Sequence, residues 1–222
     1  MELENRYFTE LARRLGSDGV KTSATDGNRL EVLLRSRPVL CVSKNGNVIM
    51  LPDGRDNPEA GDLYHQTDAL AGEVYEYVHA VENAPLLHAV DLRDKFHLLA
   101  DFGGAVLAGR RREDGHGYQF VTWIWGYDRT GVNHGHYYED DFQGAKQDFA
   151  VRSGLISKAQ LFTPEQLTEL YRASEYLLDD GPAPNDQQLK ALQEARTKIE
   201  YTVPNLAERL EQSQGQEPQM NL

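Results

Sequence analysis

The chain has 222 residues, one cysteine and a formal net charge of −12, with 40% hydrophobic and 9% aromatic residues. This composition is typical of a soluble globular protein with its own core. There is no apolar run of the roughly 20 residues that a membrane-spanning helix needs, and the opening MELENRYFTEL is no signal sequence. A lone Cys41 excludes an internal disulfide, so we expect a cytoplasmic protein.

The negative charge is confined to the part of the chain beyond residue 60. Residues 1–60 hold nine basic and nine acidic residues out of totals of 23 and 35, so residues 61–222 carry the whole −12. Such a surface repels phosphate backbones. We therefore expect no direct binding to nucleic acid.

Residues 1–58 predict a helix followed by antiparallel strands. Leu3, Tyr7, Leu11 and Leu15 recur every four residues, the pattern of an amphipathic helix over 3–15. Strands are expected over 20–25 and 29–35, and a hairpin over 38–51 that turns at Asn45-Gly46.

Residues 59–156 predict a long helix, a four-stranded antiparallel sheet and another helix. The first helix has an apolar stripe over 63–81 and ends before Pro85. The expected strands are a hairpin over 95–110 and single strands over 118–125 and 132–138, followed by a helix over 140–153. The sequence leaves open whether the two hairpin regions form one sheet or two.

The C-terminal third, residues 157–211, predicts helices only. Thr163 can cap a helix that begins at Pro164, and Gln166 can close a capping box. A last helix begins near Asn185, and residues 212–222 have no apolar periodicity, which indicates a flexible tail. Tight turns join the strands, so the predicted class is α+β, with antiparallel hairpins and meanders packed against helices.

The residues His134-Gly135-His136 suggest a metal site. Alternate residues of a strand share a face, so His134, His136 and Tyr138 are expected to point the same way. Two imidazoles about 7 Å apart along a strand can bind one metal ion. Glu139 and Asp141 could complete its ligands. The alternative is that both histidines are ordinary residues of a half-buried sheet.

The strand over 118–125 has large side chains on both faces, which is typical of a central strand covered on both sides. In a functional interpretation, Trp123, Trp125, Tyr137 and Tyr138 form an aromatic surface that binds a ligand or a partner. We also expect Trp123 to share one packed cluster with Phe120 and Phe149.

A set of short segments spans most of the chain: FVTW, DRTG, GHYY, AKQDFAVRSGL, LFT-x-EQL and the opening NRYFTELARRL. In these segments the chain resembles uncharacterised proteins carried by conjugative and other mobile elements of gut Gram-positive bacteria, most specifically over 118–155. The resemblance implies an accessory protein of a mobile element. It implies no catalytic residue.

Together these features predict a non-enzymatic interaction protein that binds another protein and needs no cofactor. The alternative is a metal-binding module or metal-dependent enzyme that uses His134 and His136. The sequence leaves the oligomeric state open.

Overall fold

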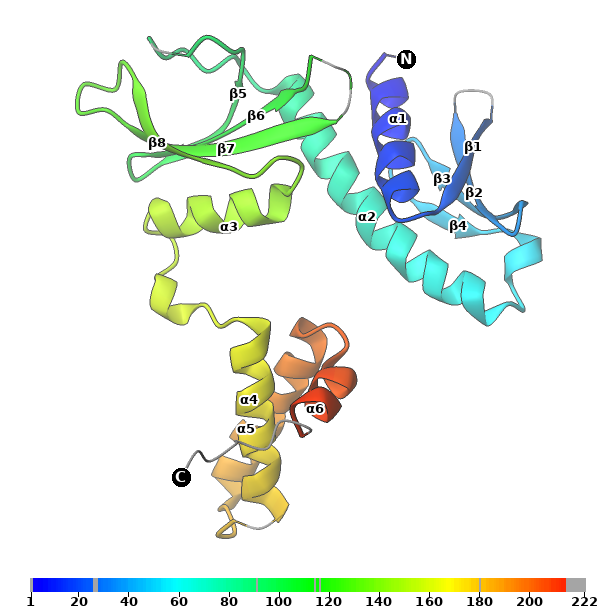
Figure 1. The fold of residues 1–222 in the computed structure, drawn as a ribbon, viewed down its shortest axis with the longest axis vertical. Helices are drawn as coiled ribbons and strands as arrows, with labels where there is room; N and C mark the ends of the chain where they lie inside the picture. The colour runs from blue at the N-terminus through cyan, green and yellow to red at the C-terminus, as the bar shows by residue number, and fades with distance from the viewer. Residues whose placement is uncertain are drawn as a thin grey trace, which may run out of the picture. The chain divides into compact units, whose positions relative to one another are not determined.

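The computed structural model describes residues 2–25, 28–90, 92–113, 115, 117–179 and 181–214. Its contacts divide the chain into two compact units, Met1–Ile156 and Ser157–Leu222. Each unit is described by itself below (Figure 1). The class is α+β, as the sequence predicts.

The first unit opens with a helix and a four-stranded sheet, here called sheet A. The helix is α1 (Glu2–Ser17), and its residues Tyr7, Leu11 and Leu15 are fully buried. The strands form an antiparallel meander of β1 (Lys21–Thr25), β2 (Arg29–Leu34), β3 (Arg37–Ser43) and β4 (Val48–Met50). Gly46 has a φ of +81° in the β3–β4 turn, which confirms the expected hairpin.

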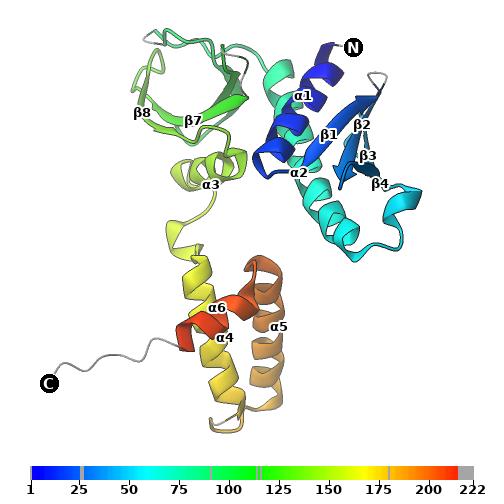
Figure 2. The same cartoon turned by 45° about the vertical axis from the view of Figure 1, so that its right-hand side comes forward.

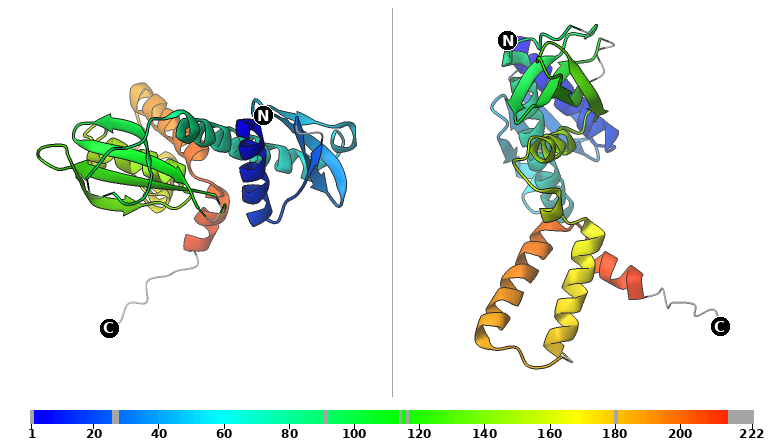
Figure 3. Two further views of the ribbon diagram at one scale, coloured as in Figure 1. Left: turned by 90° about the horizontal axis from the view of Figure 1, so that it is seen from above. Right: turned by 90° about the vertical axis from the view of Figure 1, so that its left-hand side faces the viewer.

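A long helix connects this sheet to the second one. α2 spans Pro58–Asn83, after a one-turn helix at Pro52–Gly54, and it begins earlier than the apolar stripe indicated. The Asn57 side chain caps it by accepting a hydrogen bond from the backbone N–H of Glu59 at 3.1 Å. α2 packs against β3 and β4 of sheet A and then against the second sheet, so it runs between the two sheets (Figure 3, left).

The second sheet, sheet B, is also an antiparallel meander of four strands. It consists of β5 (His97–Phe102), β6 (Ala105–Arg111), β7 (Tyr118–Trp125) and β8 (Val132–Tyr137), and α3 (Phe142–Arg152) follows it. The two hairpin regions therefore belong to two separate sheets. α3 packs on β6 and β7, on the face that α2 also covers.

Sheet B separates two apolar clusters. The larger one joins α1, α2, α3 and both sheets, and it contains Phe120 and Phe149. Trp123 lies in the smaller cluster on the opposite, outer face, with Phe96 and Val121. The expectation that Trp123 packs with Phe120 and Phe149 was therefore wrong. Alternate residues of β7 point to opposite faces, and Trp123 is an odd number of residues from Phe120.

The second unit is helical. A one-turn helix at Lys158–Gln160 precedes α4 (Pro164–Asp179), α5 (Asp186–Thr202) and α6 (Leu206–Gln214) (Figure 2). The predicted capping box of α4 is present, since Gln166 N–H donates to Thr163 Oγ1 at 3.2 Å and Thr163 N–H donates to Gln166 Oε1 at 2.9 Å. Of the tail expected over 212–222, the first residues end α6, and 215–222 lie outside the described residues.

None of the described helices is long and apolar enough to cross a membrane.

Candidate functional site

The two histidines lie on β8, the open edge strand of sheet B, beside an irregularity. Thr122 pairs with His136 and Ile124 pairs with Asn133, so Trp123 faces two residues of β8. His134 has a φ of +54° at this bulge, a left-handed conformation that is uncommon for a residue with a side chain. The regular alternation that was expected to place His134 and His136 on one face is interrupted there.

His136 instead faces a carboxylate on α3. Its Nδ1 lies 3.3 Å from Asp148 Oδ1 and 3.2 Å from Asp148 Oδ2. Thr122 Oγ1 donates a short hydrogen bond to the same carboxylate. Proximity to Asp148 also contributes, after burial, to raising the pKa of Tyr138. His136 and Tyr138 therefore lie on the same side of sheet B, as the alternation predicted for these two.

Arg152 closes this cluster. Its guanidinium donates to the carbonyl of Thr122 at 3.0 Å and to the carbonyl of His134 at 2.6 Å, so it joins the bulge of β8 to α3. The side chain of Arg152 is only 11% exposed, whereas that of His136 is 54% exposed. Asp148 can thus orient one ring nitrogen of an accessible imidazole, an arrangement suited to proton transfer. The Asp148 carboxylate also accepts the hydrogen bond from Thr122 of β7, and this contact holds β7 against α3.

The two carboxylates proposed as further metal ligands are engaged elsewhere. Asp141 is the N-cap of α3 and accepts a hydrogen bond from Gly144 N–H at 2.8 Å. Glu139 forms an ion pair with Arg112 at 2.9 Å. In the part of the chain that the structure describes, no three residues among His, Cys, Asp and Glu are grouped to hold a metal ion.

Three of the four proposed partner-binding aromatics lie on the outer face of sheet B. The ring of Trp123 makes edge contacts with Phe96 at 5.0 Å and with Tyr137 at 6.2 Å between centroids. Trp125 donates from Nε1 to Asp101 at 3.1 Å and is partly covered by the Arg129 guanidinium. Tyr138 packs on the opposite face. Trp123 is buried, whereas Tyr137 is 59% exposed.

One irregular segment covers this outer face. We call it the strap, residues 84–90 and 92–96. It places Leu87 and Phe96 on the sheet. The backbone hydrogen bonds that hold it include Leu87 N–H to Phe96 O, Val90 N–H to Thr130 O, and Leu98 N–H to Pro85 O. Nothing in the sequence predicted it, because the segment has neither helical nor alternating periodicity.

The strap borders a groove of about 570 Å³. Leu86 and Val90 line it and are 42% and 78% exposed. Arg93, Asp94 and Lys95 line the same groove. Asp94 is paired with Arg110 at 2.9 Å, so Arg93 and Lys95 bring positive charge to the groove, in a chain whose net charge is −12. The groove thus combines exposed apolar side chains with local positive charge.

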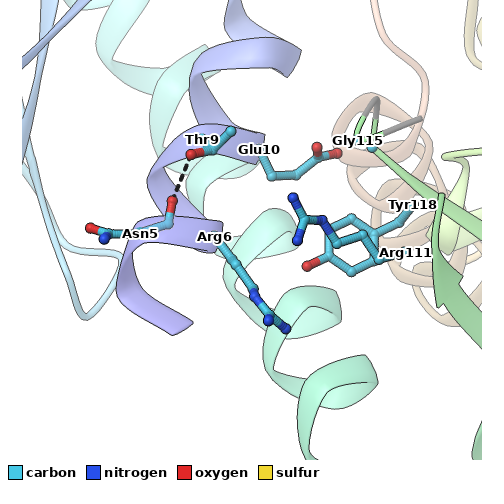
Figure 4. A pocket seen from close by; sticks show the side chains of 8 residues that line it. Asn5, Arg6, Thr9, Glu10, Arg111, Gly115 and Tyr118 are labelled. Atoms are coloured by element: carbon cyan, nitrogen blue, oxygen red, sulfur yellow. Dashed lines mark hydrogen bonds between the residues drawn. The ribbon is translucent and has the colours of Figure 1, made fainter. Parts of the chain in front are cut away.

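Another cavity, of about 220 Å³, lies between α1 and sheet B (Figure 4). Arg6 and Glu10 approach it from α1, and Arg111 and Tyr118 approach it from β6 and β7. Arg6 forms an ion pair with Glu82, which also accepts a hydrogen bond from the Tyr118 hydroxyl at 3.1 Å.

Two of the three charged residues that line this cavity, Arg6 and Glu10, are paired within the protein. The buried carboxylate of Glu10 accepts two hydrogen bonds from Arg13, at 2.7 and 2.9 Å. Arg13 also reaches Asp140, which follows β8, at 2.9 Å. These contacts neutralise the α1 side of the cavity wall. We interpret the cavity as part of the connection between α1 and sheet B.

The sequence did not suggest Asp148, Thr122 or Arg152 as site residues. Thr122 interrupts the apolar inner face of β7 between Phe120 and Ile124, and a polar residue at such a position is a signal that it has a buried partner. Its partner on α3 is 26 residues away, a pairing that periodicity cannot give.

Comparison with known proteins gives no relative: no protein-family model, curated protein or solved structure matches the chain.

Proposed function

We propose that the protein is a non-enzymatic accessory protein that binds a segment of another protein in the strap groove. The observation that carries the proposal is the exposure of Leu86 and Val90 at the border of the groove. Apolar side chains grouped at a surface hollow are typical of a binding site. The cytoplasm and a mobile genetic element are the setting that we propose, from the composition and from the sequence resemblance.

The chemistry of the groove favours a partner segment with both apolar and acidic residues. Leu86 and Val90 would contact apolar side chains, and the charges of Arg93 and Lys95 would attract carboxylates. Tyr137 would extend this surface along β8, because its ring contacts Trp123 on the outer face of sheet B, the face that the strap covers. A nucleic-acid partner is disfavoured by the net charge of −12.

Photo-crosslinking in cells tests the proposal. A photoreactive amino acid replaces Val90 in one variant and Ile49 in the control, because Ile49 is a 57% exposed apolar residue on sheet A. The expected result is a protein crosslinked from position 90 and absent from position 49.

The crosslinked protein is then purified and its affinity measured by calorimetry. We expect Val90→Asp to weaken binding at least tenfold, which is about 1.4 kcal/mol, and Ile49→Asp to leave it unchanged. Equal crosslinking from both positions, or equal affinities of the two variants, would show that the groove is not the binding site.

A further inference from the structure

The cavity between α1 and sheet B contains one charge that its neighbours do not balance. Arg111 of β6 lines the cavity, and its guanidinium forms no ion pair or hydrogen bond within the part of the chain that the structure describes. The adjacent arginines differ, because Arg110 pairs with Asp94 and Arg112 pairs with Glu139, each at 2.9 Å. Of these three arginines, Arg111 is therefore the one whose side-chain donors have no acceptor.

A second guanidinium approaches the same cavity from α1. Figure 4 shows Arg6 and Arg111 extending toward the Tyr118 hydroxyl from α1 and from sheet B. Glu82 balances the charge of Arg6, which leaves the charge of Arg111. Two like charges that face one cavity repel each other, and an anion between them relieves the repulsion.

The carboxylate of Glu10 in the cavity wall is not this anion. Glu10 is buried, and its oxygens accept hydrogen bonds from Arg13 and from the Tyr77 hydroxyl. Its ion pair is with Arg13, on the same helix. Arg111 is exposed, so its acceptor can come from solvent.

We propose that this cavity binds a small organic carboxylate, held by the guanidinium of Arg111. A guanidinium offers two parallel N–H donors, which match the two oxygens of a carboxylate. The charge of Arg6, on the α1 side of the cavity, would add to the attraction.

The size and walls of the cavity favour a small anion with a single charge. The volume is about 220 Å³, and the side chains that line it, other than the Tyr118 ring, are polar. A bulky apolar ligand is therefore disfavoured. Glu10 places a carboxylate in the wall, and this charge repels a doubly charged phosphate more strongly than a carboxylate with one charge.

Titration of the full chain with sodium acetate tests the proposal, because acetate carries a carboxylate and little else. Saturation-transfer NMR on the acetate methyl protons measures the binding, with the ionic strength held constant by sodium chloride. We expect saturable binding with a dissociation constant of about 1 mM, a reasonable value for so small a ligand.

Three variants locate the site. Arg111→Gln should weaken acetate binding by about tenfold, because it removes both the charge and the pair of donors. Arg111→Lys keeps the charge without the planar pair of donors, so its affinity should lie between those of Arg111→Gln and the natural chain. Arg37→Gln is the matched control, since Arg37 is an exposed arginine of β3 that does not line the cavity. It should leave acetate binding unchanged, and circular dichroism checks that all three variants are folded.

Acetate binding that does not saturate would overturn the proposal. Equal affinities of the Arg111→Gln and Arg37→Gln variants would do the same, because acetate would then bind elsewhere. Inorganic phosphate is finally added as a competitor. Phosphate that binds more tightly than acetate would overturn the choice of a carboxylate, and weaker binding of phosphate would support it.

Discussion

The hydroxyl of Tyr77 on α2 donates a hydrogen bond to Glu10 Oε1 on α1, at an oxygen–oxygen distance of 2.7 Å. Both residues are buried, Tyr77 completely and Glu10 to 4% exposure, and Arg13 donates two hydrogen bonds to the same carboxylate. The carboxylate is thus the common acceptor for a phenol and a guanidinium at the interface of α1 and α2.

Removal of this acceptor should cost more than removal of the phenol hydroxyl. Glu10→Ala leaves the buried Tyr77 hydroxyl without its acceptor and leaves Arg13 with Asp140 as its remaining carboxylate, so we expect a loss of about 3 kcal/mol in the free energy of unfolding. Tyr77→Phe removes one hydrogen bond and should cost about 1 kcal/mol. Urea denaturation measures both, and equal losses would contradict the role given to Glu10.

Alkaline titration should reveal a group of protected tyrosines. Burial raises the pKa of Tyr7, Tyr77 and Tyr118 above the ordinary value, and the charges of Glu10 and Glu82 add to the effect for Tyr77 and Tyr118 respectively. The unfolded chain loses these protons near pH 10 while the folded chain retains them. The stability that these three phenols contribute should therefore be fully present below pH 10. The free energy of unfolding should fall as the pH rises beyond 10.

Absorbance at the phenolate band, followed together with circular dichroism, checks this expectation. The late part of the phenolate signal should appear only as the protein unfolds, and Tyr118→Phe should reduce that late part. A signal that is complete before the ellipticity changes would argue against burial of these three phenols.

Phe149 anchors α3 to the larger apolar cluster and is 8% exposed. Phe149→Ala should reduce the free energy of unfolding by about 3 kcal/mol, from lost burial and the cavity left behind. Phe102→Ala is the control, because Phe102 is 56% exposed, and it should change stability little. If the two variants melt at the same temperature, α3 does not pack as described.

Metal analysis of the purified protein addresses the alternative function. We expect no stoichiometric transition metal and no effect of a chelator on melting, since a metal bound only by the folded state would stabilise it. About one equivalent of metal, lost in the His134→Ala/His136→Ala variant, would revive the metal-dependent alternative.

Binding to duplex DNA should be undetectable at near-physiological salt, because the net charge of −12 opposes association with phosphates. A labelled duplex and fluorescence anisotropy provide the measurement. Tight, salt-sensitive binding would require a localised basic site and would change the class of partner.

The sequence predicted those features that depend on neighbouring residues. The capping box at Thr163 and Gln166 is local chemistry, and the opposite faces of β7 follow from alternation. The bounds of the turn between β2 and β3 were less exact. The strand was expected to continue to residue 35, whereas Arg35 and Ser36 form the turn with φ values of +50° and +67° and no glycine indicates them. The bulge at His134 was also missed, although Gly135 beside it is the kind of residue that often marks a bulge within a strand.

The candidate sites depend more on tertiary structure. Asp148 meets His136 because α3 packs on β6 and β7, next to β8. The strap covers Trp123 without any periodic pattern of its own. The sequence did suggest His134 and His136 on β8, and Trp123, Trp125 and Tyr137 on the outer face. It did not suggest the residues that contact them from α3 and the strap.

The bond between Arg13 and Asp140 joins residues that are 127 positions apart. During synthesis, α1 leaves the ribosome long before residue 140 is made, so this contact cannot form while most of the first unit is still being translated. The apolar side of α1 can pack on sheet A and α2 earlier. The contact of its polar side with Asp140 can form only after residue 140 has been made. Completion of the first unit during translation is therefore tied to the appearance of the segment just after β8.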